Sequence, residues 1–116
     1  MLKIESHMTG IDTGEQVMFS DFEHDGEMWK GQGPRQSRHK VKFSQRFNAT
    51  PVVQVNMTMW DADSKTNLRG DLQAEKITRD GFELVFRTWG DSRVARIRAS
   101  WLAIGPVGHE EEWDLY

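Results

Sequence analysis

The 116-residue chain contains no cysteine, only 3 prolines and no long apolar run. Without cysteine it has no disulfide, no thiolate metal site and no thiol nucleophile. No segment approaches the ~20 consecutive apolar residues of a membrane helix, so we expect no membrane insertion. The first residues, "MLKIESHMTGIDTG", are interrupted by charges and lack the apolar centre of a secretory signal. We therefore expect synthesis in the cytoplasm, with any release or surface display following a non-classical route.

The motifs of common enzymes and metal sites are also missing. There is no Gly-x-Ser-x-Gly elbow, phosphate-binding loop or dinucleotide fingerprint, so we expect no catalytic residue and no cofactor. The 4 histidines lack zinc-site spacing, and "DADSKTN" (61–67) starts like a calcium loop without its glycine and terminal glutamate. We expect no bound metal. The net charge of −3 argues against nucleic acid as the main partner.

The sequence does contain a series of short runs that are typical of β-strands and are separated by turn residues. Hydrophobic residues make up 37% and charged residues 28% of the chain, which fits one soluble globular domain. The regular spacing predicts an all-β sandwich or barrel. The expected strands cover residues 14–22, 26–31, 39–47, 51–60, 68–77, 81–89 and 93–104. Helix propensity competes only in 71–78, where Leu72 and Ala74 alternate with polar residues and favour a strand.

Alternation along these strands assigns their two faces. The residues expected in the core are Val53, Val55, Met57, Met59, Phe82, Leu84, Phe86, Ala95, Ile97, Ala99 and Trp101. The opposite faces carry both charge signs, with Arg96 and Arg98 on one strand and Asp71 and Glu75 on another. The pattern favours a solvated polar face, but these residues could also pair across a subunit interface.

Between residues 41 and 104 several short motifs occur in a characteristic order. They are "VKFSQRF", "PVVQVNMTMWDAD", "NLR", "ITRDGF", "TWGD" and "RASWLAIG". Their order and spacing resemble those of the H-type lectin domain, the module of snail agglutinins and of the C-terminal half of discoidins. The resemblance implies a six-stranded antiparallel β-sandwich with a looser N-terminal extension. It also implies a homotrimer, which could stack into a hexamer, with glycan sites between protomers for N-acetylgalactosamine or galactose-type sugars.

The resemblance further implies which residues bind the sugar. Arg69, in "NLR", takes the place of the family's site arginine, and Trp89, in "TWGD", that of its site tryptophan. Gly90 stands where the snail lectin has a histidine that contacts the sugar, so one specificity contact of the family is missing. Gly33 and Arg35, in "GQGPRQSR", are the nearest match to a family loop that supplies a further contact.

The chemistry of a sugar suits these residue types. A pyranose has an apolar C–H face and hydroxyls around its edge, so its site needs an aromatic platform beside fixed polar groups. Trp89 can be the platform, Arg69 a fork of donors and Asp91 an acceptor. Structural interpretations stay open for each: an edge aromatic for Trp89, a salt bridge to Asp71 or to a partner carboxylate for Arg69, and a turn former for Asp91.

The preferred interpretation is a non-catalytic carbohydrate-binding protein, a lectin of the kind that mediates cell adhesion. The alternative is a structural or assembly module, such as a trimeric knob of a fibre or virus-like particle, whose sugar site has degenerated. Gly90 supports that alternative. A third interpretation is a polysaccharide or nucleic-acid binder that uses a basic face formed by Arg35, Arg38, Lys40 and Lys42.

We divide the chain into three segments. Residues 1–40 form an N-terminal segment of strands and Gly-rich loops packing on the same domain, 41–105 the lectin-like core and 106–116 an acidic tail. The tail ends in "EEEWDLY", whose apolar residues we expect to dock on the domain or on a partner.

Overall fold

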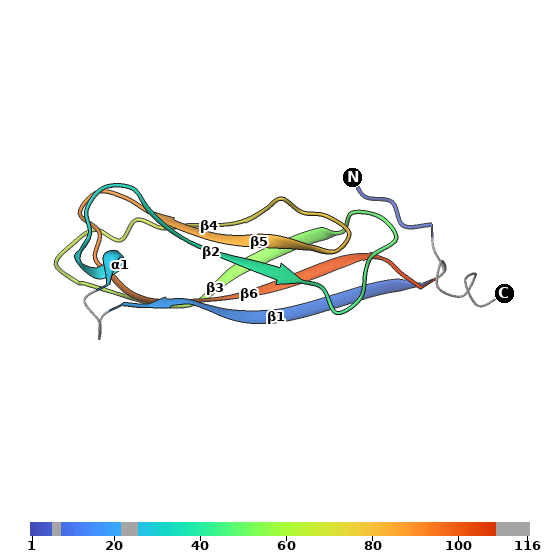
Figure 1. Ribbon diagram of the computed structural model, residues 1–116, viewed down its shortest axis with the longest axis horizontal. Helices are drawn as coiled ribbons and strands as arrows, with labels where there is room; N and C mark the ends of the chain where they lie inside the picture. Colours follow the sequence, from blue (N-terminus) through green and yellow to red (C-terminus); the bar gives the residue numbers. More distant parts are fainter. Residues whose placement is uncertain (6–7, 22–25, 109–116) are drawn as a thin grey trace.

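The strand-forming runs fold into two three-stranded antiparallel sheets that pack as a β-sandwich (Figure 1). The computed structural model describes residues 1–5, 8–21 and 26–108. One sheet has the order β1-β6-β3 and the other β2-β5-β4. The strands are β1 (Thr9–Ser20), β2 (Arg35–Lys42), β3 (Val52–Ala62), β4 (Asp71–Glu75), β5 (Gly81–Thr88) and β6 (Val94–Pro106). The described residues thus form the six-stranded antiparallel sandwich that the resemblance to the H-type lectin domain implied.

The core lies between the sheets, where alternate side chains of each strand point toward the opposite sheet. The central strands β5 and β6 are the most completely buried. Phe82 of β5 is 4% exposed, and Leu84 and Phe86 are fully buried. On β6, Ile97 is fully buried and Trp101 is 8% exposed. The core positions predicted for these two strands are confirmed.

Aromatic rings surround Trp101 at one end of the core. Phe82 meets the indole edge-on, with ring centroids 5.5 Å apart, and Phe43 lies at 5.9 Å. Gly14 of β1 lets the indole lie against the backbone, because a Cβ there would be 2.6 Å from Trp101 Nε1. A side chain at position 14 would therefore displace the ring on which this end of the core is built.

Two β-bulges alter the alternation on the outer strands of the β1-β6-β3 sheet. The register shifts between Val17 and Phe19 in β1, and between Met57 and Met59 in β3. Both shifts lie at the level of Arg98 on β6. A bulge inserts one extra residue and bends its strand. As a result Met59, which was expected in the core, pairs with Arg98 and lies outside the core cluster.

Residues 26–31, expected as a strand, instead contain the short helix α1 (Glu27–Lys30). The backbone N–H of Met28 donates to Asp21 Oδ2 at 3.1 Å, and that of Trp29 donates to the carbonyl of Gly26 at 3.0 Å. Met28 is 3% exposed, so this turn buries an apolar side chain without strand pairing. In the described part of the chain no helix has the length and apolar character needed to cross a membrane.

Strand β4 is shorter than the predicted strand, but the prediction that this segment is a strand and not a helix is confirmed. β4 covers only part of residues 68–77, but Leu72 and Ala74 pack against the core as the alternation required. Lys76 follows it with a φ of 51°, a left-handed conformation that ends the strand.

The first forty residues contribute to both sheets. β1 pairs with β6 in one sheet and β2 pairs with β5 in the other. This segment therefore belongs to the sandwich itself. The predicted docking of the acidic tail concerns residues 109–116, which lie outside the described residues.

Candidate functional site

The corner that follows β5, residues Trp89–Asp91, lies at the end of the sandwich where α1 is found (Figure 1). Gly90 has a φ of 68°, a left-handed conformation that glycine adopts without strain. Its carbonyl accepts hydrogen bonds from the Gly33 N–H at 3.0 Å and from Arg35 Nη2 at 3.1 Å. The predicted loop before β2 therefore lies directly against the predicted corner, although 55 residues separate Arg35 from Gly90.

Arg35 lies beneath this corner and is only 4% exposed. Its Nε donates to the Gly33 carbonyl at 3.0 Å, and its Nη1 donates to the Met28 carbonyl at 3.1 Å. The other two hydrogen bonds that the Arg35 guanidinium donates also go to backbone carbonyls. The guanidinium therefore joins α1, the 31–34 loop and Gly90. In this chain Arg35 positions the corner from below, while Gly33 supplies a left-handed turn with a φ of 75°.

Two buried hydroxyls hold the segment that carries Arg69 against the same corner. Ser92 Oγ donates to the Asn67 carbonyl at 2.5 Å and accepts from the Arg69 N–H at 3.1 Å. Thr88 Oγ1 donates to the Arg69 carbonyl at 2.5 Å. Sequence reasoning missed both residues. Their signal was their position, since they bracket the Trp-Gly-Asp corner and can bond a neighbouring backbone.

The Arg69 side chain lies across the corner and forms an ion pair with Asp91. Its Nη1 donates to Asp91 Oδ1 at 2.5 Å and to Ser92 Oγ at 3.2 Å. The hydrogen bond from Arg69 to Asp91 lowers the pKa of the Asp91 carboxyl from its ordinary value. The salt bridge considered for Arg69 thus involves Asp91, not Asp71. A Cβ at Gly90 would be 3.1 Å from Arg69 Nη1, so glycine leaves room for the guanidinium.

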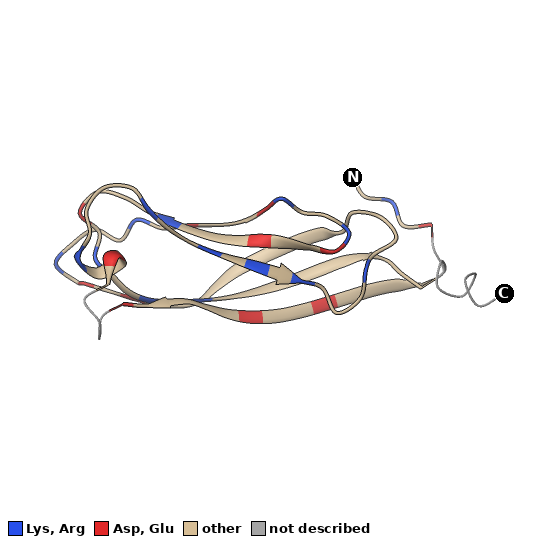
Figure 2. Cartoon of the chain, in the orientation of Figure 1, with Lys and Arg blue, Asp and Glu red and all other residues tan. Residues whose placement is uncertain are grey.

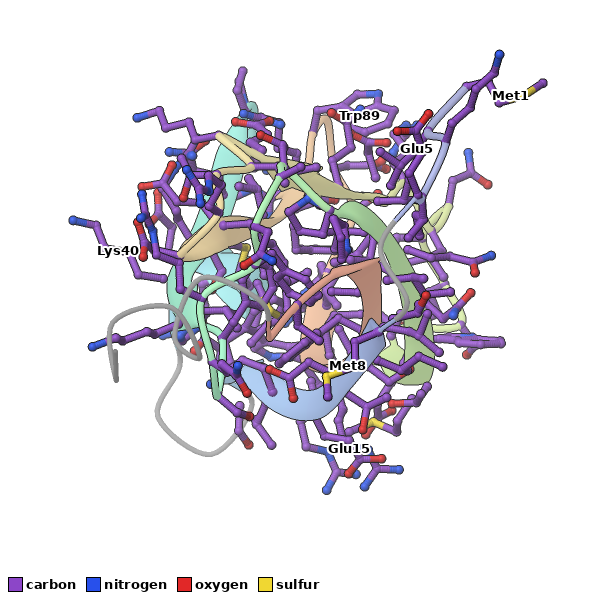
Figure 3. All side chains as sticks on the ribbon, turned by 90° about the vertical axis from the view of Figure 1, so that its right-hand side faces the viewer. Met1, Glu5, Met8, Glu15, Lys40 and Trp89 are labelled. Atoms are coloured by element: carbon purple, nitrogen blue, oxygen red, sulfur yellow. The ribbon has the colours of Figure 1, made fainter. Side chains whose placement is uncertain are left out.

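Trp89 stands at the periphery of the molecule, with its side chain directed away from the core (Figure 3). It is 46% exposed, in contrast to the buried Trp101. Beside it lies a groove of about 420 Å³, whose polar walls come from Glu27, Arg35, Gln36, Arg87 and Thr88. Arg69 and Asp91 do not line this groove. The groove beside Trp89 therefore lies on the β2 side of the sheet. Arg69 lies on the β4 side, in the segment before β4.

The 61–67 segment is a structured turn. Asp63 Oδ1 accepts from the Lys65 N–H at 2.9 Å, and Asp63 Oδ2 pairs with Arg93 at 3.4 Å. The Arg93 guanidinium in turn lies 4.3 Å from the ring centroid of Trp29. Asp63 thus has local partners. Within the described ranges no three His, Asp or Glu side chains gather in a way that could hold a metal ion.

Comparisons with known proteins show which family and fold the chain is similar to. The profile of the H-type lectin domain matches residues 38–104. A protein of Fuscovulum blasticum, "ATP synthase subunits region ORF 7", is 52% identical over 106 residues, which cover 91% of this chain and 92% of that protein. Discoidin-2 of Dictyostelium discoideum is 31% identical over 81 residues, which cover 69% of this chain and 32% of the discoidin.

The fold itself recurs in a solved discoidin. The native structure of recombinant discoidin II of Dictyostelium discoideum matches with a TM-score of 0.75 at 24% sequence identity. The match covers 93% of this chain and 41% of that chain. The chain therefore spans less than half the length of the discoidins that it matches.

Proposed function

This chain belongs to the H-type lectin domain family, and on that premise we propose that it is a non-catalytic carbohydrate-binding protein with its sugar site at the Trp89–Asp91 corner. The observation that carries the proposal is the arrangement around Gly90. A half-exposed indole precedes Gly90, and the guanidinium of Arg69 lies against it, held by Asp91. This arrangement joins an apolar surface to fixed polar groups.

Each side chain of the proposed site has a separate role, which follows from the chemistry of a pyranose. The C–H face of the ring packs on the indole of Trp89, which is rigid and loses little entropy on binding. Arg69 donates to ring or acetamido oxygens, and Asp91 accepts from hydroxyls. The ion pair fixes both polar groups before the sugar arrives, so little further ordering is needed.

Galactose-type sugars, including N-acetylgalactosamine, are the ligands we propose, although Gly90 removes one contact of the family. The lost contact weakens the site for a single sugar. A shallow site of this kind would bind at about millimolar strength, or roughly −4 kcal/mol. Three such sites on one particle would raise the affinity for a multivalent glycan by roughly 10²–10⁴.

For the assembly we propose a homotrimer in which unlike faces of neighbouring protomers meet. Arg98 is exposed on the outer face of the β1-β6-β3 sheet, and Gln73 on that of the β2-β5-β4 sheet. Head-to-tail contacts between such different faces can close into a ring. Arg96 pairs with Asp61 at 2.7 Å, whereas Arg98 has no carboxylate partner in the described part of the chain. Arg98 is therefore the residue we expect to face a neighbouring protomer, and two rings could stack as a hexamer.

Light scattering at micromolar concentration tests this assembly. We expect a mass of three chains for the wild-type protein and a single-chain mass for Arg98→Glu, with an unchanged β-sheet spectrum. Lys65→Glu, which reverses a charge in the 61–67 turn, is the control and should remain assembled. A single-chain mass for the wild-type protein would exclude the trimer and any site shared between chains.

A glycan array tests the sugar site directly. Trp89→Ala should abolish glycan capture and leave the melting temperature close to that of the wild-type protein. Trp60→Ala is a matched control, because Trp60 is also exposed, at 59%, but lies on β3. Loss of capture by Trp60→Ala, with capture retained by Trp89→Ala, would place the platform elsewhere.

A structural or assembly module is the second candidate function. It is favoured by Gly90 in place of the family's histidine and by the engagement of Arg69 with Asp91. On this alternative the wild-type protein would be a trimer that captures no glycan. The array and the scattering measurement together therefore separate the two functions.

A further inference from the structure

A second groove lies at the opposite end of the β2-β5-β4 sheet from Trp89. Its volume is about 520 Å³, and its walls come from the end of β2, the segment after β4 and the start of β5. Three lysines, Lys40, Lys42 and Lys76, line it and define what we call the lysine groove. No group of the proposed sugar site takes part in it.

Two of the three lysines of the lysine groove, Lys40 and Lys42, have no carboxylate partner among the described residues. Lys40 and Lys42 lie two residues apart on β2, roughly 7 Å along the strand, and both are exposed. Neither forms an ion pair with another described residue. Figure 3 shows Lys40 extending away from the sandwich, and Figure 2 shows the basic positions along β2. The lysine groove thus presents free ammonium groups to solvent.

The carboxylates of the lysine groove already have partners. Glu83, whose side chain is 11% exposed, accepts from Arg38 Nη1 at 2.7 Å and pairs with Lys76 Nζ at 3.5 Å. Burial opposes ionisation of Glu83, but the hydrogen bond from Arg38 holds its pKa below the ordinary value. Asp80 pairs with Arg46 at 3.2 Å. An incoming anion would therefore meet a net positive surface.

The backbone of β2 lies close against Gly81, one of the residues that line the lysine groove. Gly81 pairs with Lys42 in the sheet, and a Cβ at this position would be 2.1 Å from the Val41 carbonyl oxygen. No side chain can stand there without moving the backbone. Gly81 thus adds no side chain to the groove that Lys42 and Lys76 line.

We propose that the lysine groove binds the carboxylate or sulfate groups of an anionic polysaccharide, at a site separate from the Trp89 corner. A polysaccharide fits better than a single-stranded nucleic acid, because the latter is usually bound by exposed aromatic rings that stack on bases. The aromatic residue lining this groove, Phe82, is 4% exposed. The net charge of −3 also disfavours general attraction of polyanions, so binding depends on the local lysines.

The test compares dextran sulfate, polygalacturonate and neutral dextran as probes in titration calorimetry at low and physiological salt. The variant Lys40→Gln/Lys42→Gln is matched by Lys3→Gln/Lys65→Gln, which changes the net charge equally. We expect the wild-type and control proteins to bind a sulfated or carboxylated probe but not neutral dextran. The groove variant should bind at least about tenfold more weakly. The slope of the logarithm of its binding constant against the logarithm of the salt concentration should also become shallower by roughly two, because two fewer lysines release counterions from the polyanion.

Other results would overturn the proposal. These are a wild-type protein that binds neither polyanion, an equal loss in the control variant, or equally tight binding of a single-stranded oligonucleotide. Binding of dextran sulfate alone or of polygalacturonate alone supports the site and identifies the anionic group. Trp89→Ala should retain polyanion binding, and the groove variant should retain capture on the glycan array. Failure of one site is thus distinguishable from failure of the other.

Discussion

Replacement of Ser92 by alanine tests how the corner is held. One fully buried oxygen, Ser92 Oγ, joins the Asn67 carbonyl, the Arg69 N–H and the Arg69 guanidinium, at 2.5, 3.1 and 3.2 Å. Ser92→Ala removes this oxygen and adds no bulk. The carbonyl and the N–H then lose their partner at a position that water reaches poorly.

The expected cost can be worked from these contacts. A buried polar group that loses its partner costs about 1–3 kcal/mol. Two backbone groups are affected, but Asn67 is exposed and Arg69 half-buried, so part of the loss is recovered by solvation. We therefore expect Ser92→Ala to lower the free energy of unfolding by about 2–3 kcal/mol. Since domains of this size have about 5–15 kcal/mol in total, the variant should still fold.

Urea unfolding followed by tryptophan fluorescence measures the effect. Ser92→Ala should lower the midpoint with an unchanged slope, and it should weaken glycan capture because Arg69 is no longer fixed. Ser64→Ala, at an exposed position of the 61–67 turn, is the control and should stay within about 0.5 kcal/mol of the wild-type protein. If the two variants unfold at the same midpoint, the reasoning is refuted, because the 67–69 segment must then be held by other contacts.

Three further predictions concern the corner, the core and the charged face. Gly90→Ala should cost about 1–2 kcal/mol of stability, from its left-handed φ of 68°, and should reduce glycan capture by crowding Arg69; Gly90→Asn should be milder, and equal denaturation midpoints for both would contradict this account. Trp101→Ala should cost about 3–5 kcal/mol in urea unfolding, since the indole is 8% exposed, and a loss below 1 kcal/mol would remove it from the core. A hydrogen bond from Arg87 holds the pKa of Glu75 below its ordinary 4.5, so its stabilisation is complete above about pH 4.5 and is lost as the pH falls through the lowered pKa. Glu75→Gln should therefore be less stable than the wild-type protein at neutral pH, and the difference should shrink in acid; a difference constant from neutral pH to pH 3 would contradict this.

The fold was predictable wherever a strand was long and alternated strictly. β6 meets both conditions, and its buried positions match the sequence pattern. β5 buries the predicted Phe82, Leu84 and Phe86, but it also buries Glu83 and Val85, which the alternation did not predict. The pattern failed at α1, where "GEMWKG" is too short to distinguish a strand from a turn of helix. The conformation there depends on Asp21 and Arg35, which bond to it from outside the segment. A local pattern cannot contain such contacts.

The candidate site was predictable to the extent that its residues lie in short contiguous motifs. Trp89, Gly90 and Asp91 are adjacent in sequence, and the sandwich brings Arg69 beside them. The sequence did not show that Arg35 is buried, because its burial depends on a turn of helix that was not predicted and on the Gly90 carbonyl, 55 residues away. The sequence pattern also suggested that Arg35 and Arg38 form one basic face with Lys40 and Lys42.

That basic face is divided by the fold. Arg35 turns inward, and Arg38 is engaged by Glu83 and Glu75 at 2.7 and 3.2 Å. Lys40 and Lys42 remain exposed and are joined by Lys76 from beyond β4. Neighbours in sequence were therefore a poor guide to neighbours in space, since strand pairing decides which charges meet.

The paired bulges of the β1-β6-β3 sheet bear on how this protein avoids polymerising. β1 and β3 are long outer strands, of 12 and 11 residues, and a regular outer strand offers a row of unpaired backbone groups to any passing chain. The extra residue in each, at the level of Arg98, breaks that row and bends the strand. We expect this irregularity to hinder a second copy from continuing the sheet in register. We therefore expect copies of the chain to associate through side chains on their faces, as in the proposed trimer, and not by extending the sheet.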